Sequence, residues 1–292
     1  MKIKQTVGER VWNWSIISVM FLVGLATLYP LIYVFSMSIS AQEYVLRQEV
    51  WFLPKGFSLA SYKLVFENQQ IWTAYRNTLW YTTVGTIVNV LLTLLGAYAL
   101  SRRQFFVRRQ LSFLITFTMF FTGGMIPLFI LINNIGLYDT RWAMILPTAV
   151  GAWYLIIAQS FFASLPESLE ESAKLDGAND FVVFLRIALP VSKPIIAVLI
   201  LYYAVGHWNS YFNAMLYLPS VDLQPLQMYL MKILTQASTE LAGNMSAGIE
   251  RDNIVEQLKY ATIIVAVLPV LCVYPFLQKY FVKGVMVGAV KG

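Results

Sequence analysis

Hydrophobic residues occur along this chain in long runs that polar stretches separate. Runs without Asp, Glu, Lys or Arg cover residues 14–36, 78–100, 111–134, 142–163, 194–218 and 260–278. Each run approaches the roughly 20 residues that a helix needs to cross about 30 Å of hydrocarbon. The pattern predicts an all-α membrane protein in which residues 1–292 form a single transmembrane domain of six helices. An even number of spans places both termini on the same side of the membrane.

The composition agrees with a membrane environment. The chain is 58% hydrophobic and 12% charged, whereas soluble domains contain roughly 25% charged residues. Lys2, Lys4 and Arg10 precede the first run, as basic residues do in a signal peptide. However, this run is longer than the roughly 7 to 15 apolar residues of a cleavable signal. We therefore expect residues 14–36 to remain attached as the first helix.

The net charge of +6 indicates which side of the membrane the loops and termini occupy. Basic residues concentrate in the short cytoplasmic loops of membrane proteins. The stretch between the second and third runs carries no acidic residue and these arginines: Arg102, Arg103, Arg108 and Arg109. The charge pattern therefore predicts cytoplasmic termini. A basic chain can also bind nucleic acid, but no basic stripe with interleaved aromatic residues lies outside the runs, so membrane lipid is expected around this chain and no nucleic acid.

The sequence contains no energy source for transport. It has no G-x-x-x-x-G-K-[ST] phosphate loop, and the runs contain no acidic or basic residue except His207, whereas ion-coupled carriers keep charged groups at mid-membrane. No H-E-x-x-H or G-x-S-x-G motif occurs, and one histidine with one cysteine cannot form a metal site. We expect no enzyme activity, no metal and no cofactor bound by this chain. The bundle either forms a passive pore or is driven by another protein.

In the loop of residues 164–193, the pattern of residues predicts two short helices joined by a turn. Ser164 and Glu167 have capping-box spacing, and Pro166 suits the start of a helix. Gly177 can end that helix because glycine tolerates positive φ. Apolar residues form a stripe before the turn and another after it: Leu165, Leu169 and Ala173, then Phe181, Phe184, Leu185 and Ala188 up to Pro190. Such an elbow suits insertion into a cleft of a partner; the alternative is a surface loop that packs on its own bundle.

This loop contains a motif. Glu171-Ser172-Ala173 is followed by three residues, Gly177, nine residues and Ile187-Ala188-Leu189-Pro190. The pattern resembles the EAA motif, E-A-A-x(3)-G-x(9)-I-x-L-P, of ABC importer permeases. The one departure is Ser172, where the family has an alanine, and Asp176 precedes the glycine. The resemblance implies a type I ABC importer permease fold with a cytoplasmic coupling-helix elbow between helices 4 and 5.

The resemblance extends over the whole chain. It is similar to the smaller permease of carbohydrate importers, including its ending QKYFVKGVMVGAVKG, and residues 123–147 resemble permeases for larger oligosaccharides such as alginate and pectin fragments. The resemblance implies a permease subunit that moves an oligosaccharide, with a uronate or alginate-type fragment as the narrower expectation, across the bacterial cytoplasmic membrane. It implies as partners a second permease of a different chain, two ABC ATPase subunits that bind ATP and magnesium, and an extracytoplasmic solute-binding protein.

Carried onto this sequence, the resemblance places the ATPase contact in the elbow and in the tail. The expected elbow residues are Glu167, Glu170, Glu171, Ser172, Ala173, Leu175, Asp176, Gly177, Ala178, Phe181 and Phe184. In the tail, residues 279–292, the expected contacts are Lys283, Gly284 and Gly288. The alternative role of the tail is a basic anchor near the membrane.

The sugar path is indicated by aromatic and amide side chains, which suit saccharides. Candidates are His207, Trp208, Asn209, Tyr211 and Asn213 in the fifth run, with Asn89 and Asn133 in earlier runs. His207 and Tyr211 are four residues apart and are expected on one helix face. The alternatives are an aromatic belt at the membrane interface or packing between subunits for the first set, and hydrogen bonds between helices for Asn89 and Asn133.

Other functions remain open at this point. The motif indicates the motor and not the cargo, so an ABC permease for another small solute is one alternative. A passive channel or secondary carrier is a second, since its transport needs no ATPase. A membrane scaffold without transport is a third.

Overall fold

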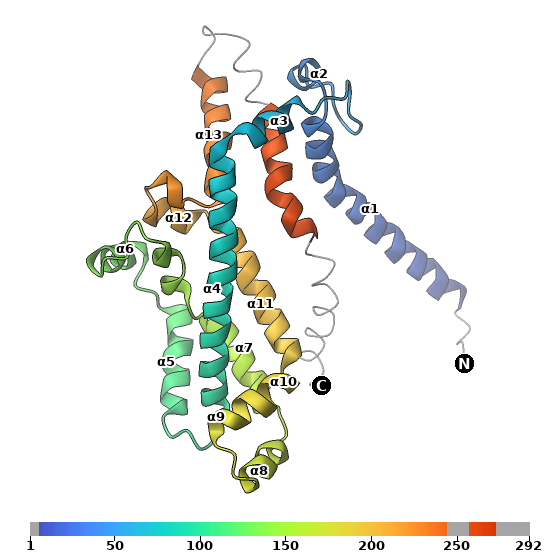
Figure 1. Ribbon diagram of the computed structural model, residues 1–292. Coiled ribbons are helices and arrows are strands. Elements are labelled where there is room, and N and C mark those ends of the chain that lie inside the picture. Colours follow the sequence, from blue (N-terminus) through green and yellow to red (C-terminus); the bar gives the residue numbers. More distant parts are fainter. Residues whose placement is uncertain (1–5, 244–256, 273–292) are drawn as a thin grey trace. The chain divides into compact units, whose positions relative to one another are not determined.

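The computed structural model describes residues 6–243 and 257–272, and these residues form helices joined by turns (Figure 1). Over these ranges no β-strand forms, and the only pairing of extended backbone is an isolated bridge between Ser40 and Phe57. The chain divides into two compact units. One contains residues 1–69 and 230–268, and the other contains residues 70–229 and 269–292.

The first unit contains the long amino-terminal helix α1, Val7–Ser38. A capping box begins it: the Thr6 hydroxyl accepts from the Glu9 amide at 3.3 Å, and the Glu9 carboxylate accepts from the Thr6 amide at 2.8 Å. Most side chains of α1 are exposed although they are apolar, which suits a helix that faces lipid. The prediction of a first helix over residues 14–36 is confirmed.

Short helices complete the first unit. They are α2, Gln42–Leu46, and α3, Ala60–Glu67, followed by the carboxy-terminal helix Gln257–Cys272 and the end of α13, Leu226–Gly243. The helix Gln257–Cys272 covers the first part of the predicted span 260–278, and residues 273–278 lie outside the described residues. The Gln257 side-chain amide donates to the Ser40 carbonyl at 2.6 Å, so this helix is fixed to the end of α1.

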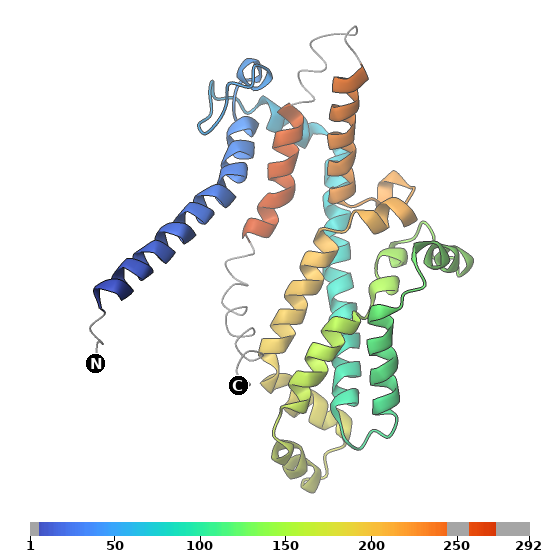
Figure 2. The same cartoon turned by 180° about the vertical axis from the view of Figure 1, so that it is seen from behind.

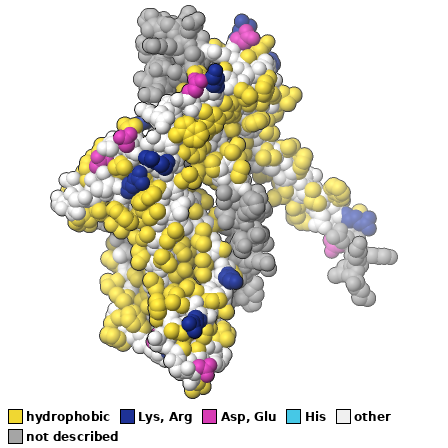
Figure 3. Space-filling model, viewed as in Figure 1, with side chains coloured by type: hydrophobic (Ala, Val, Ile, Leu, Met, Phe, Trp, Pro, Cys, Tyr) yellow, Lys and Arg dark blue, Asp and Glu magenta, His cyan; other side chains and the backbone are white. Residues whose placement is uncertain are grey.

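The second unit is built around α4, Gln69–Ser101. Beside it lie α5, Arg108–Phe120, α7, Ala152–Ala163, and α11, Lys193–Trp208 (Figures 1 and 2). Helix α4 confirms the predicted helix over 78–100 and is longer than predicted by two turns at its start. On the face that Figure 3 shows, apolar side chains cover most of this unit.

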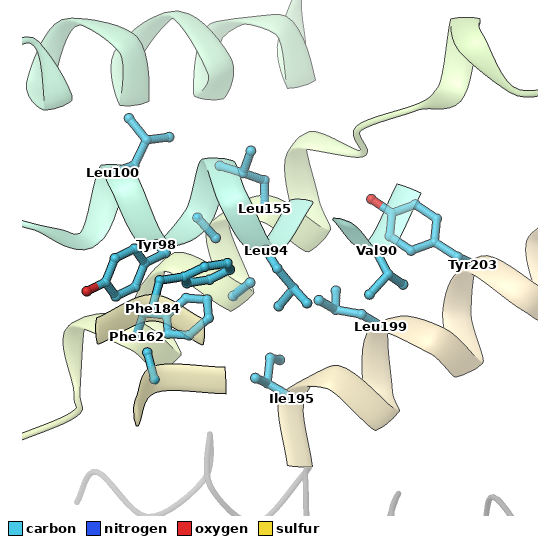
Figure 4. Close-up of a cluster of buried hydrophobic side chains, with 13 residues drawn as sticks. Val90, Leu94, Tyr98, Leu100, Leu155, Phe162, Phe184, Ile195, Leu199 and Tyr203 are labelled. Carbon is cyan, nitrogen blue, oxygen red and sulfur yellow. The ribbon is translucent and has the colours of Figure 1, made fainter. Parts of the chain in front are cut away.

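The core of the second unit lies where α4, α7 and α11 meet. The buried side chains there include Leu94, Leu155 and Leu199 together with the ring of Phe162 (Figure 4). Tyr203 closes one end of the cluster, and its hydroxyl shares a hydrogen bond of 2.7 Å with the Thr93 hydroxyl. A buried hydroxyl without a partner would destabilise the fold, so this pair fixes the register of α11 against α4.

The prediction of one continuous helix is wrong for three of the apolar runs, because each of these runs is broken into shorter helices. The run 111–134 forms α5 and α6, Met125–Asn134, which meet at 115°. The break covers residues 121–124, and Gly124 in it has a φ of +86°, a conformation that only glycine adopts readily. Such a break cannot be detected by counting apolar residues.

The runs 142–163 and 194–218 are broken as well. The first starts as two 3₁₀ turns, η1, Arg141–Met144, and η2, Leu146–Thr148, and these bend by 51° into α7 near Pro147 and Gly151. The second ends α11 at Trp208 and resumes as α12, Phe212–Tyr217. Across the described residues, α1 and α4 alone are each long and apolar enough to cross a membrane. Three bent helix pairs satisfy this test only as pairs: α5 with α6, residues 141–148 with α7, and residues 180–191 with α11, which meet at 82°. The turn η4, Val221–Leu223, leads from α12 into α13.

Candidate functional site: a surface elbow and an open cavity

The predicted elbow forms at one end of the second unit (Figure 1). Its first arm is α8, Glu167–Leu175, and its second arm consists of α9, Asp180–Val183, a π-helical turn η3, Phe184–Ala188, and α10, Leu189–Val191. The predicted capping box at the start of α8 is wrong. Ser164 instead ends α7, where its hydroxyl donates to the Phe161 carbonyl at 2.7 Å, and Pro166 is the residue that precedes α8.

Gly177 ends α8 in the predicted manner. Its φ is +80°, and its amide donates to the Lys174 carbonyl at 3.0 Å. The Ala178 amide reaches back to the Ala173 carbonyl, also at 3.0 Å. These two bonds form a Schellman motif, which satisfies carbonyls that the end of a helix leaves free. The turn is therefore fixed by backbone hydrogen bonds, and its left-handed residue is the glycine of the motif.

Polar contacts fix the second arm against the first. The Asn179 side chain accepts from the Val182 amide at 2.9 Å and caps α9. Lys174 on α8 forms an ion pair of 2.8 Å with Asp180. The second arm continues to Val191 instead of stopping at Pro190 as predicted, and its π turn lies just before that proline. Proline removes a helical donor and crowds the preceding turn, which accounts for irregular helix geometry here.

The inner side of the elbow packs on its own bundle. The buried residues are Ala173 on α8 and Val183, Phe184 and Ala188 on the second arm. The Phe184 ring lies 4.9 Å from the ring of Tyr98 and 6.4 Å from that of Phe162 (Figure 4). Ala173 and Phe184, both expected at a partner interface, therefore lie behind the exposed surface.

The outer side of the elbow exposes apolar side chains among carboxylates. Leu175 is 89% exposed and Phe181 is 60% exposed. The expected interface residues that are exposed are Glu167, Glu171, Ser172, Leu175, Asp176, Gly177 and Phe181. Glu170 and Ala178 are partly buried. An exposed leucine and an exposed phenylalanine on the same elbow as acidic groups suit an interface with an apolar centre and a charged rim.

An open cavity of about 380 Å³ lies in the second unit and is lined by residues of α4, α7, α11 and α12 and of the turns η1 and η2. Asn89, His207 and Asn213 line it, so the structure brings together three of the candidates for the sugar path. Three tyrosines that the sequence analysis missed also line it: Tyr154, Tyr202 and Tyr203. Their rings form a cluster, with centroids 5.4 Å apart for Tyr154 and Tyr202 and 4.8 Å for Tyr154 and Tyr203.

Asn89 Oδ1 and His207 Nε2 are buried and have no hydrogen-bond partner among the described residues, and Nε2 lies on the ring edge that packs against Gly85. The Asn89 amide group donates to the Thr148 carbonyl at 2.9 Å, which orients its oxygen. The His207 ring lies against Gly85, where a Cβ would come within 2.8 Å of its Cδ2. Aromatic walls with a few oriented polar groups are typical of small-molecule sites, so this cavity can receive a hydroxylated ligand.

The other path candidates lie outside this cavity. The Trp208 ring is buried with its centroid 6.5 Å from that of Tyr75, and the Asn209 side chain donates to the Val205 carbonyl at 3.0 Å. Tyr211 and Asn133 are exposed. The prediction that His207 and Tyr211 share a helix face is wrong, because α11 ends at Trp208 and α12 begins at Phe212.

The tail candidates Lys283, Gly284 and Gly288 lie outside the described residues.

Comparisons with known proteins agree on one family. The model of the family "Binding-protein-dependent transport system inner membrane component" matches residues 90–287. The polygalacturonan/rhamnogalacturonan transport system permease protein YtcP of Bacillus subtilis is 42% identical over 97% of this chain and 99% of its own length. The LplC protein of the same organism is 40% identical over 96% of this chain and 95% of its own.

A solved structure gives the same result. It is the crystal structure of a bacterial ABC transporter involved in the import of the acidic polysaccharide alginate. One of its chains matches with a TM-score of 0.88 and 33% identity, covering 96% of this chain and all of the matched chain.

Proposed function

Because the chain belongs to the family of binding-protein-dependent transport system inner membrane components, we propose that it is the permease subunit of an ATP-driven importer that moves an oligosaccharide across the bacterial cytoplasmic membrane. Permeases of this family work with other subunits of an ABC transporter and with a binding protein, and they are not catalytic. The elbow is the observation that carries the proposal. It is anchored to its own bundle on one side and exposes Leu175 and Phe181 on the other.

The proposed partner of the exposed elbow is an ABC ATPase. A stiff, partly apolar projection can enter a cleft on another protein, and Glu171 and Asp176 beside it supply charges for basic or donor groups there. ATP and magnesium are bound by two such ATPase subunits and not by this chain. The remaining proposed partners are a second permease of a different chain, which completes the path, and an extracytoplasmic solute-binding protein.

The proposed topology follows the charges. Six spans with cytoplasmic termini place the elbow on the same side of the membrane as Arg102, Arg103, Arg108 and Arg109, in agreement with the positive-inside rule. This side is where an ATPase has access to ATP. The tail, residues 279–292, is proposed as a second contact with the ATPase.

The proposed cargo is an oligosaccharide of the acidic kind. The names of two relatives support it, since one transports polygalacturonan and rhamnogalacturonan and the other imports alginate. The cavity lined by Asn89, His207 and Asn213 is the proposed part of the path that this chain contributes. The amide and imidazole groups that line it can bind sugar hydroxyls, and its tyrosine rings can pack on the apolar faces of the sugar.

Reconstitution tests the proposal. The chain is coexpressed with a second permease and the ATPase subunits, purified, and placed in liposomes with ATP inside and binding protein outside. We expect oligogalacturonide-loaded binding protein to stimulate ATP hydrolysis and uptake to require ATP. The same assay with a neutral oligosaccharide and with an alginate fragment, each presented with the same binding protein, shows which class of saccharide is transported.

Two outcomes contradict the proposal. A purified complex without a nucleotide-binding subunit would remove the proposed motor. Uptake that continues without ATP would indicate the passive channel or secondary carrier.

The cavity has its own test. In His207→Leu an imidazole that can bind a sugar hydroxyl is lost, and we expect the maximal rate of uptake to fall about tenfold, as for other sites that lose a buried hydrogen-bonding group. Asn133→Leu is the matched control, because Asn133 is exposed on α6 and does not line the cavity. Equal uptake by both variants would place the sugar path elsewhere.

A further inference from the structure

Arg102, at the end of α4, connects three helices through its guanidinium group. Nη1 forms an ion pair with the carboxylate of Glu170 on α8. Nη2 donates to the Phe162 carbonyl in the last turn of α7 at 2.9 Å. Nε donates at 2.9 Å to the hydroxyl of Ser101, which is itself oriented by donating to the Tyr98 carbonyl at 2.6 Å. Every nitrogen of the group therefore has a partner on the chain.

This contact is partly shielded from water. The side chains of Arg102 and Glu170 are 21% and 14% exposed, and the guanidinium lies 4.5 Å from the centre of the Tyr98 ring. The neighbouring pair of Arg103 and Glu167 joins the same two segments at 3.4 Å, but its side chains are 81% and 65% exposed. Exposed pairs contribute little, whereas breaking a shielded pair leaves an uncompensated charge. Arg102 thus provides the stronger of these two connections.

Helix α8 has one face for each neighbour. Glu170 and Ala173 are three residues apart and share the face toward the chain's own bundle, where Ala173 is buried. Ser172 and Leu175 are three residues apart and share the exposed face. A force that a partner applies to the exposed face of α8 therefore reaches the bundle through the face that carries Glu170, the residue that pairs with Arg102.

We propose that Arg102 is a positioning residue for coupling, which transmits movement of α8 to α4 and α7. The proposal rests on the proposed function, because it requires a partner that moves α8. Short linkers flank α8, namely residues 164–166 before it and residues 176–179 after it, and without a firm connection they would absorb the movement. Arg102 supplies this connection at the point where α4, α7 and α8 meet.

The connection continues into the bundle. The side-chain amide of Gln159 on α7 donates to the Leu100 carbonyl at the end of α4 and to the Ser112 hydroxyl on α5, each at 3.2 Å. A displacement of α8 is thus passed to a group of helix ends that are already joined by hydrogen bonds. Lysine at position 102 could keep the charge, but it lacks the planar fork that binds Glu170 and the Phe162 carbonyl together.

The first experiment measures saccharide transported per ATP hydrolysed in the reconstituted complex. We expect Arg102→Ala to lower this ratio about tenfold, within the range of typical coupling energies, while ATPase subunits still copurify. Arg102→Lys is expected to fall between Arg102→Ala and the wild type. Arg109→Ala is the matched control, because Arg109 is an exposed arginine of the same basic stretch and forms no ion pair among the described residues; its ratio should stay within about twofold of the wild type.

The second experiment is independent of any partner. Amide hydrogen exchange of the full-length chain in lipid nanodiscs is compared between Arg102→Ala and the wild type, and we expect the amides of α8 to exchange about tenfold faster in the variant. Transport by the reconstituted wild-type complex tests the proposed function, whereas the exchange measurement tests only the connection that Arg102 makes to α8.

Unchanged exchange in α8, or a wild-type transport ratio in Arg102→Ala, would overturn the proposal. If Arg102→Ala reduces the amount of inserted chain, the transport ratio is measured in Glu170→Gln instead. This variant keeps the size of residue 170 and leaves Arg102 its contacts with Phe162, Ser101 and Tyr98. A normal ratio in Glu170→Gln would also overturn it.

Discussion

The turn at Gly177 offers a graded perturbation of the elbow. Gly177 has a φ of +80° and is exposed, and no atom lies within 4 Å of the position that a Cβ would take. A new side chain therefore meets no steric obstacle. Its effect comes from the backbone conformation alone, so the series Asn, Ala and Pro at this position separates backbone strain from lost packing.

The expected magnitudes follow from the turn geometry. Alanine in the left-handed region costs about 1 to 2 kcal/mol, which lowers the ratio of formed to opened turn by about 5- to 30-fold. Asparagine tolerates this region and should cost much less. Proline cannot reach a φ of +80°, and it removes the amide that donates to the Lys174 carbonyl at 3.0 Å, so a cost of about 3 kcal/mol or more is expected.

Two measurements check the series. Hydrogen exchange of the Ala178 amide reports the turn directly, because this amide donates to the Ala173 carbonyl only when the Schellman motif is formed. Sugar-stimulated ATP hydrolysis in liposomes reports the consequence for coupling. We expect both to follow the order Asn, Ala, Pro, with Gly177→Pro still inserted in the membrane but uncoupled.

Normal transport by Gly177→Pro would refute the reasoning that the elbow must keep this shape. Equal effects of Asn and Pro would refute the backbone argument, since these two residues differ in their access to positive φ. Gly24→Ala is the matched control because its Cβ also meets no atom within 4 Å, but Gly24 lies inside α1 at an ordinary helical φ.

Two further pairs of variants test the packing. Phe184→Ala should destabilise the chain by about 3 to 5 kcal/mol because it opens a cavity beside the core rings. Phe181 is 60% exposed, so Phe181→Ala should leave thermal stability unchanged. It should instead lower the stimulation of ATP hydrolysis. Equal melting temperatures for the two variants would contradict the assignment of inner and outer sides. Gly85→Ala should destabilise by about 1 to 3 kcal/mol through its clash with His207, and Gly206→Ala, inside α11 with open space at its Cβ, should stabilise by about 0.5 to 1 kcal/mol. Thermal unfolding in detergent measures both, and a stabilised Gly85→Ala would contradict the close packing of His207.

Local patterns determined much of this protein. Charge-free runs located α1 and α4, because the length of a span is set by the bilayer and can be counted in the sequence. The elbow was predicted with its turn at Gly177, because positive φ is a local requirement that a glycine between two amphipathic stretches satisfies. The motif around Glu171 and Pro190 indicated the family, and the comparisons show it.

Tertiary structure decided the rest. Apolar runs cannot reveal the bend at Gly124 or the end of α11 at Trp208, because hydrophobicity measures the surroundings of a residue and not the direction of the backbone. The sequence does not single out Tyr154, Tyr202 and Tyr203, since only the packing of α7 against α11 brings them around one cavity.

Arg102 shows the same limit most clearly. In the sequence it is one of several arginines in a short basic stretch, which all carry the same information about topology. The fold brings Glu170 and the Phe162 carbonyl to Arg102 from positions 68 and 60 residues away, and it leaves Arg103 in solvent. The sequence determined that this end of the bundle is basic. Only the structure decided which arginine holds the elbow, because that depends on which side chain the packing of α4, α7 and α8 shields from water.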